Sequence, residues 1–170
     1  MVWAYADATD KVVFREAMAA FPSGVTIVTT VDDAGRWWGF TATSFCSVSM
    51  EPPLTLVCLA RSAECHDTFA VAQRWVVHII HPRQISLATR FATRGADKFA
   101  DAGFVAHDHG LPVLPGACVT LHCSAHNKFK GGDHTILVGR VERAWIGDEI
   151  PAVYFRRRYH VPSRYIDVRT

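Results

Sequence analysis

The spacing of apolar residues along the chain predicts many short strands and few helices. Apolar positions that recur every three or four residues are typical of amphipathic helices, whereas β-branched runs and strict alternation are typical of strands. On this basis we expect helices at residues 10–21, 63–73 and, after Pro82, 85–91. We expect strands at residues 25–31, 36–41, 54–59, 75–80, 117–126 and 134–146.

Turn-forming residues separate these segments. Asp32-Asp33-Ala34-Gly35 and Gly131-Gly132-Asp133 each lie between two predicted strands, which favours antiparallel hairpins. Residues 93–116 show no regular period, and residues 151–165 form a tail rich in aromatics and arginines that we expect to cross to another subunit. Short strands joined by turns, without a succession of parallel βαβ units, predict an antiparallel barrel with few peripheral helices.

Composition and charge narrow the classes of function. The 170 residues are 49% hydrophobic and 20% charged, which is typical of one globular domain. A net charge of +2 without a concentrated basic stripe argues against a nucleic-acid partner. No apolar run reaches about 18 residues, so no membrane span is expected. Five cysteines without a CxxC pair, and no visible secretory signal, predict a reduced protein of the cytoplasm.

Familiar catalytic and metal-binding patterns are absent from the sequence. Cys118, His122 and His126 are expected on one strand face, but residues four apart on a strand are about 13 Å from one another, too far for one tetrahedral zinc. His107 and His109 form a pair without an obvious third ligand, so no metal is expected. There is no GxSxG or HExxH motif for a hydrolase. GxGxxG and P-loop motifs are also missing, so a dinucleotide would not be held by a strand–loop–helix unit.

The stretch from Gly39 to Arg61 is the strongest candidate for a binding site. Small and hydroxyl-bearing residues are concentrated in its first half, before the rigid Pro52-Pro53 pair and an apolar strand. Such residues let backbone amides approach a flat or phosphorylated ligand closely. The alternative interpretation is a Ser/Thr-rich hairpin on the rim of the barrel.

Several motifs in order resemble the short-chain flavin reductases, the small components of two-component flavin-dependent monooxygenases. The motifs are FPSGVTIVTT (21–30), TATSFCSVSMEPPL (41–54), GDHTILVGRV (132–141) and YFRRRY (154–159). The similarity covers about residues 12–160 of a single domain expected over 1–170. It implies a mainly β, Greek-key, FMN-binding split barrel that forms a homodimer. It also implies reduction of FAD or FMN by NAD(P)H, with NADH favoured, and delivery of reduced flavin to a separate monooxygenase.

The resemblance further implies roles for individual residues. The segment matching 41–47 would line the isoalloxazine ring and ribityl chain, and the segment matching 58–62 would continue that wall. Among the remaining positions, His134 would be the catalytic residue beside the nicotinamide. The expected cofactor-binding residues are Thr41, Ala42, Thr43, Ser44, Ser47, Cys58, Leu59, Ala60, Ser62, His66, Arg90, Phe91, His134 and Tyr159.

The chain departs from the family pattern at three positions, and two other functions stay open. Thr43 stands where many relatives have Asn, His66 where they often have Ser or Thr, and Arg157 where Gly is common. One alternative is a flavin- or haem-binding split barrel without turnover. The other is an enzyme similar to the pyridoxine-phosphate oxidases. In the favoured reading the cofactors carry the redox chemistry and the protein supplies binding and orientation.

Overall fold

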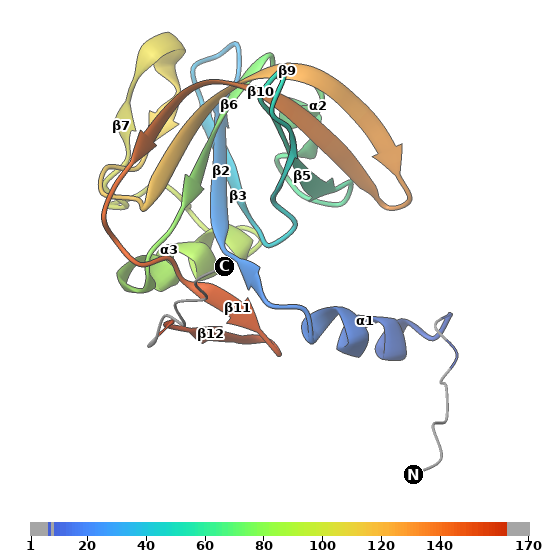
Figure 1. The fold of residues 1–170 in the computed structure, drawn as a ribbon. Coiled ribbons are helices and arrows are strands. Elements are labelled where there is room, and N and C mark those ends of the chain that lie inside the picture. The colour runs from blue at the N-terminus through green and yellow to red at the C-terminus, as the bar shows by residue number, and fades with distance from the viewer. Residues whose placement is uncertain (1–6, 8, 163–170) are drawn as a thin grey trace.

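The computed structural model describes residue 7 and residues 9–162, and these form mostly antiparallel β structure (Figure 1). The helices are α1 (Lys11–Ala19), α2 (His66–Val71) and α3 (Ile85–Ala92), with 3₁₀ turns at Pro82–Gln84 and Asp108–Gly110. The strands are β1 (Ser23–Gly24), β2 (Thr26–Val31), β3 (Trp37–Ala42), β4 (Cys46–Ser49), β5 (Leu54–Ala60), β6 (Arg74–Ile79), β7 (Val105–Ala106), β8 (Pro112–Val113), β9 (Val119–Gly131), β10 (His134–Ile146), β11 (Val153–Phe155) and β12 (Arg158–His160).

Seven of the strands form one antiparallel sheet in the order β3-β2-β6-β9-β10-β5-β4. The sheet curves so that the chain after β3 reaches β5, where the Cys58 N–H donates to Ser44 Oγ at 2.9 Å. Among the described residues no ladder of strand hydrogen bonds joins β3 to β5 or β4. The mainly β, antiparallel fold is therefore confirmed, with a barrel that is open on one side.

The centre of the sheet is packed on both faces, which explains the continuous apolar run of β6. Trp75, Val76, Val77 and His78 are all buried. One apolar cluster around Trp75 and Phe69 fills the interior, and a second around Ile27, Ile80 and Phe91 lies between the sheet and α3. The aromatic Phe69 of α2 packs edge-on against Phe40, which fixes α2 on the inner side.

Gly139 is needed for this packing. A β carbon placed there would lie 2.7 Å from the Trp75 ring and 3.0 Å from Cys123 Cβ. The register of β9 against β10 shifts next to it, between Val138 and Gly139, so β9 carries an extra residue at His126. This bulge interrupts the strict alternation that the sequence predicts for residues 117–126.

Most predicted elements are present, with differences at the edges. The strand expected at 134–146 has those bounds, whereas the helix expected at 63–73 is shorter, because residues 62–65 turn across the end of β5. The irregular region 93–116 contains the short β7–β8 pair. Strand β4 was not predicted; it has only four residues, and its side chains are mostly exposed, as is common on a sheet edge.

The tail folds back on its own chain within the described residues. Strands β11 and β12 form a hairpin, and β11 pairs with β1 through Ser23 and Tyr154. The turn between them places Arg156 and Arg157 at φ 47° and 61°, a left-handed conformation that Gly adopts with less strain. The part of the predicted tail beyond residue 162 lies outside the described residues, so the expected crossing to another subunit stays a prediction.

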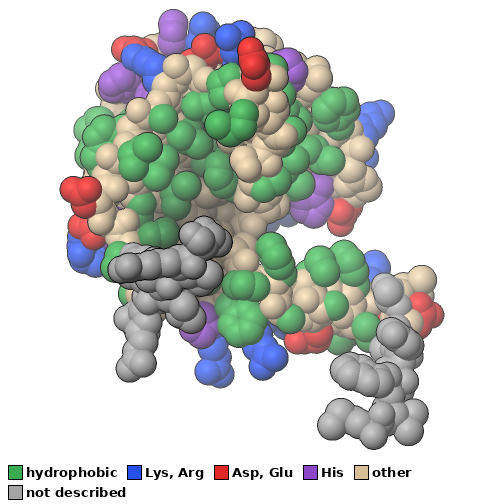
Figure 2. Space-filling model, viewed as in Figure 1, with side chains coloured by type: hydrophobic (Ala, Val, Ile, Leu, Met, Phe, Trp, Pro, Cys, Tyr) green, Lys and Arg blue, Asp and Glu red, His purple; other side chains and the backbone are tan. Residues whose placement is uncertain are grey.

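Helix α1 projects away from the rest of the molecule (Figure 1). Its predicted apolar stripe includes Phe14 and Met18, which are 56% and 55% exposed, and none of the residues of α1 is buried. Figure 2 shows apolar side chains along this projection. Among the described residues, no helix is both long and apolar enough to cross a membrane.

Candidate functional site

A cavity of about 1010 Å³ occupies the opening of the sheet. Strand β3 with the turn before it forms one wall, and the end of β5 with the following residues 62–65 forms the opposite wall. The third side is the segment 91–99, which begins on α3, and His134 lies at the cavity edge. The site is thus made by the part of the fold where the strand ladder stops.

Backbone groups are available in this opening for a local reason. Within the described part of the chain β3 is an edge strand, so one of its sides carries N–H and C=O groups without a strand partner there. Residues Cys58–Ala60 of β5 extend beyond the stretch that β4 pairs with, which ends at Leu56. On the β5 wall Ser44 Oγ bonds both the Cys58 N–H and the Cys58 carbonyl, and the Ala60 carbonyl accepts from the Ala63 N–H. A flat ligand with polar edges can therefore use main-chain groups chiefly on the edge of β3.

Half of the cofactor-binding residues expected from the sequence line this cavity. They come from four separate segments of the chain, which only the fold brings together. They are Thr41, Cys58, Leu59, Ala60, Ser62, Phe91 and His134. Thr41 is anchored because its hydroxyl donates to the Ala88 carbonyl at 2.6 Å, and this fixes the end of β3 against α3.

The other expected residues lie elsewhere. Ala42 is buried in the interior cluster, while Thr43, Ser44 and Ser47 are exposed on the chain that leaves β3 and enters β4. Arg90 points to the Ala100 carbonyl, to which its Nη1 donates at 2.7 Å. Tyr159 packs against Tyr154 with ring centroids 5.1 Å apart, in the cluster below α3.

His66 and Ser62 lie in a smaller hollow of about 500 Å³ next to the cavity. Its other lining residues are Arg61, Asp67 and Asp133. The imidazole of His66 is held at both nitrogens, with Nε2 2.9 Å from Thr135 Oγ1 and Nδ1 3.2 Å from Asp67 Oδ1. Ser62 borders both spaces, so the two hollows form one continuous surface around it.

His134 opens β10, directly after the Gly131–Asp133 turn, and pairs with Ala60 across the strands. Its Nδ1 lies 2.7 Å from Asp133 Oδ1. This hydrogen bond is the largest of the effects that lower the pKa of the Asp133 carboxyl. With Nδ1 donating to the carboxylate, Nε2 is left for a ligand in the cavity.

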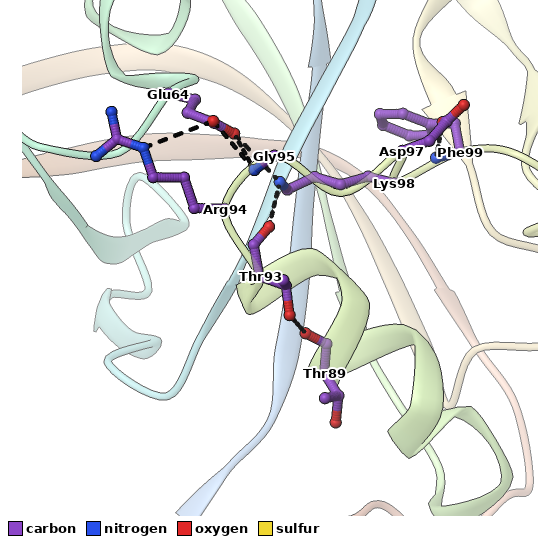
Figure 3. A network of polar contacts seen from close by, with 8 residues as sticks. All are labelled: Glu64, Thr89, Thr93, Arg94, Gly95, Asp97, Lys98 and Phe99. Carbon is purple, nitrogen blue, oxygen red and sulfur yellow. Dashed lines mark hydrogen bonds and ion pairs between the residues drawn. The ribbon is translucent and has the colours of Figure 1, made fainter.

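The wall formed by residues 93–99 depends on Glu64, which sequence reasoning did not single out. Both carboxylate oxygens of Glu64 accept from the Gly95 N–H at 3.1 Å, and Arg94 Nε and Lys98 Nζ each lie 3.7 Å from the carboxylate (Figure 3). Glu64 follows β5 and the other three follow α3, so no local spacing in the sequence signals the contact.

Aromatic side chains complete the wall on the β3 side. Trp37 meets Phe99 edge-on at 5.4 Å, and Phe99 in turn meets Phe91 at 5.1 Å. Trp38 donates from Nε1 to Asp32 Oδ2 at 2.8 Å and is covered by the Arg36 guanidinium at 4.2 Å. These contacts fix the indoles in place, which makes the wall rigid and apolar.

The described residues contain no group of three or more His, Cys, Asp or Glu side chains that could hold a metal ion. Burial raises the pKa of the Cys65 thiol to about 11 and that of Cys123 to about 12. These two thiols are therefore protonated at neutral pH and serve as packing residues rather than nucleophiles.

Comparison with known proteins gives one consistent family. The model of the flavin reductase like domain matches residues 18–163. An actinorhodin polyketide dimerase of Streptomyces coelicolor is 44% identical over 153 residues, covering 89% of this chain and 86% of the relative. An NADH:riboflavin 5'-phosphate oxidoreductase of Streptomyces pristinaespiralis is 42% identical over 153 residues, covering 88% and 87%.

Two further matches are the reductase component of a monooxygenase and a protein of known structure. The reductase component of a 4-nitrophenol 4-monooxygenase/4-nitrocatechol 2-monooxygenase from Rhodococcus opacus is 39% identical over 163 residues, covering 95% of this chain and 87% of the relative. A Streptomyces globisporus NADH:FAD oxidoreductase, solved in complex with NAD and FAD fragments, superimposes with a TM-score of 0.87 at 31% identity. That match covers 98% of this chain and 99% of the other.

Proposed function

Because this chain belongs to the flavin reductase like family, we propose that it is an NADH:flavin oxidoreductase that reduces FAD or FMN and supplies the reduced flavin to a partner monooxygenase. The observation that supports the site is the cavity between β3 and β5. It lies where edge backbone groups, an apolar aromatic wall and His134 converge.

The residues present fit a flavin. A cavity of about 1010 Å³ is at the upper end of the roughly 300–1,000 Å³ found for small-molecule sites, so a tricyclic ring leaves room for a second ring. Its walls combine apolar side chains, such as Leu59 and Phe91, with polar ones, such as Thr41 and Ser62, and the edge of β3 adds main-chain groups. We assign the ring to the space between Thr41 and Cys58–Ala60.

In the proposed reaction a hydride passes from the nicotinamide to the flavin, and no protein nucleophile is required. The protein contributes the shape of the slot that holds the two rings. Thr41, fixed by Ala88, and Cys58, fixed by Ser44, hold the two walls apart at a constant distance. Stacking two rings in that slot replaces an unfavourable encounter by a preformed arrangement. Donors on the strand edges stabilise the negative charge that accumulates on the reduced ring.

His134 is the side chain that we assign to nicotinamide binding. Asp133 fixes its Nδ1, and its position at the start of β10 places it opposite Ala60 at the cavity edge. In this orientation Nε2 faces a ligand as a hydrogen-bonding group. The remaining expected residues, at 43–47 and at His66, would contact the parts of the flavin that extend from the slot.

We also propose a homodimer. The exposed stripe of α1, together with Phe21 at 71% exposure, is an apolar surface that a second copy could cover. Analytical ultracentrifugation should give twice the chain mass for the wild type and a shift toward monomer for Phe14→Glu. A cytoplasmic location completes the proposal, because all five cysteines are free thiols.

The test of the function is flavin-dependent oxidation of NADH. Purified chain is mixed with NADH and excess FMN or FAD, and the nicotinamide absorbance is followed with and without flavin. Loss of NADH that requires both protein and flavin supports the proposal. No rate above the flavin-only background would leave a binding protein without turnover, and FMN that stays bound through dialysis would favour the pyridoxine-phosphate-oxidase-like alternative.

A further inference from the structure

The carboxylate of Glu64 occupies a site that has the character of an anion site. Three groups converge on it from the segment after α3: the Gly95 N–H, the Arg94 guanidinium and the Lys98 ammonium (Figure 3). A backbone N–H together with two cations is the arrangement that proteins use for phosphate oxygens. The group bound there in the free chain is a carboxylate of its own.

Lys98 is the clearest sign that this site serves a ligand. Its side chain is only 16% exposed, and its Nζ donates one hydrogen bond within the described residues, to the Thr93 carbonyl at 2.9 Å. The distance of 3.7 Å to Glu64 is an ion pair rather than a hydrogen bond. An ammonium has three donors, so this one has donors left for an anion that approaches more closely than Glu64 does.

The charges also favour exchange of the carboxylate for a phosphate. Arg94 and Lys98 carry two positive charges, and Glu64 neutralises one of them. A phosphate monoester carries about −1.5 to −2 at neutral pH, which matches the two cations once the carboxylate has moved away. Asp97, the other acid of this segment, is directed to the Phe99 and Ala100 N–H groups instead.

The location is suitable for a nucleotide cofactor. Glu64, Arg94, Gly95 and Lys98 all line the same cavity as Thr41 and His134. We propose that the Arg94–Gly95–Lys98 group is a subsite for a phosphate of the flavin or of the nicotinamide cofactor, and that Glu64 occupies it as a competing internal anion in the free chain. This inference rests on the proposed function of the cavity. Glu64 thereby sets affinity for phosphorylated ligands and leaves affinity for their unphosphorylated counterparts unchanged.

Two ligand pairs that differ only in one phosphate test the inference by calorimetric titration: FMN against riboflavin, and reduced nicotinamide mononucleotide against reduced nicotinamide riboside. Glu64→Gln keeps an oxygen for the Gly95 N–H and removes the competing charge. We expect Glu64→Gln to raise the affinity for the phosphorylated ligand of one pair at least about fivefold. The affinity for the unphosphorylated ligand of that pair should change less than about twofold. Lys98→Met should lower the affinity for the same phosphorylated ligand about tenfold. Glu142→Gln, which makes the same change on β10 away from the cavity, is the control.

The outcomes are distinct. Selectivity within the flavin pair supports the subsite and assigns it to the flavin phosphate, and selectivity within the nicotinamide pair supports it and assigns it to the phosphate on the nicotinamide ribose. Equal changes for both members of each pair, or no change at all, overturn the inference and make Glu64 a structural brace. The wild-type NADH oxidation assay is run separately. If the wild type turns over and Glu64→Gln is unselective, only this inference fails and the proposed function stands.

Discussion

The centre of the sheet and its open side contain the same kind of strands but use their polar groups differently. In the centre, His78 of β6 has both ring nitrogens occupied: Nδ1 donates to the Ile27 carbonyl at 3.0 Å, and Nε2 accepts from the Leu114 N–H at 3.1 Å. At the opening, His134 is half-exposed and has one nitrogen committed, to Asp133. Where the ladder is complete, polar groups stabilise the fold; where it stops, they are available to a ligand.

The difference teaches where function is located in a small β protein. The central strands exclude water and hold their histidine neutral, since burial lowers the pKa of His78 to about 4. The opening is bounded by side chains of the same buried clusters, such as Leu59 and Phe91, so its walls are rigid. Changes on one side should therefore alter stability, and changes on the other should alter ligand affinity.

Filling the opening should have the largest effect. Ala60→Trp places an indole in the slot between β5 and β3, and we expect flavin affinity to fall at least about 100-fold, close to 3 kcal/mol. The melting temperature should stay within a few degrees. Titration of protein with FMN by fluorescence, alongside circular dichroism, measures both quantities.

The control for this change is Ala144→Trp, at an exposed position of β10 outside the cavity. It should leave flavin affinity as in the wild type. If Ala60→Trp bound FMN normally while folded, the ring would have been assigned to the wrong space.

The centre of the sheet, where His78 is buried, should make the folding stability depend on pH. His78 has its usual pKa near 6.5 in the unfolded chain and about 4 in the folded one, so below pH 6.5 the unfolded chain takes up a proton that the folded chain refuses. The titration of His78 should thus leave folding stability constant above pH 6.5 and lower it as the pH drops toward 4. The full loss is roughly 3 kcal/mol.

Urea unfolding between pH 7 and pH 4 measures this slope. His78→Gln lacks the titrating group and should lower stability at pH 7 while flattening the slope in this window. An unchanged slope in the variant would assign the acid sensitivity to other groups.

Adding a methyl group to the packed centre of the sheet should lower the folding stability by a somewhat smaller amount. Gly139→Ala forces a methyl group to within 2.7 Å of the Trp75 ring, and we expect about 2 kcal/mol of destabilisation. Gly24→Ala is matched because a β carbon at that glycine meets nothing within 4 Å. Chemical denaturation compares the two variants. FMN affinity of folded Gly139→Ala should equal that of the wild type, and a large loss of affinity would mean that the two regions are coupled.

The smallest of these effects concerns His134. His134→Ala should raise KM for NADH about tenfold, equivalent to one hydrogen bond of about 1.4 kcal/mol, and change the FMN affinity less than twofold. His126→Ala, an exposed histidine on β9, serves as the control. Steady-state rates at varied NADH give the constants. A normal KM in the His134 variant would remove this residue from the nicotinamide site.

The sequence was sufficient to predict the strands at the centre of the sheet, but it predicted the strands and residues around the opening only in part. Runs such as Trp75–Ile80 show a buried strand directly, because burial on both faces leaves a continuous apolar signal. Strand β4 gives no such signal, because it has only four residues and lies mostly exposed at the edge of the sheet. The motif resemblance assigned Thr41 and Cys58–Ala60 to one continuous wall of a single site, which local patterns alone do not; only the structure shows them on opposite walls of the cavity.

Contacts between distant segments were beyond sequence reasoning. Glu64 and Lys98 are 34 positions apart, and each is unremarkable in its own segment: one precedes a helix and the other lies in a stretch without a regular period. They meet because the chain after α3 folds over the end of β5. The same holds for α1, whose spacing predicts an apolar stripe but not whether anything covers it.

The central claim is that the opening between β3 and β5 binds the flavin ring. A crystal structure of the chain with FMN tests it most directly. We predict the isoalloxazine ring between Thr41 and Cys58–Ala60, with His134 at its edge. A ring bound anywhere else on the molecule, with this opening left as it is in the free chain, would contradict the account.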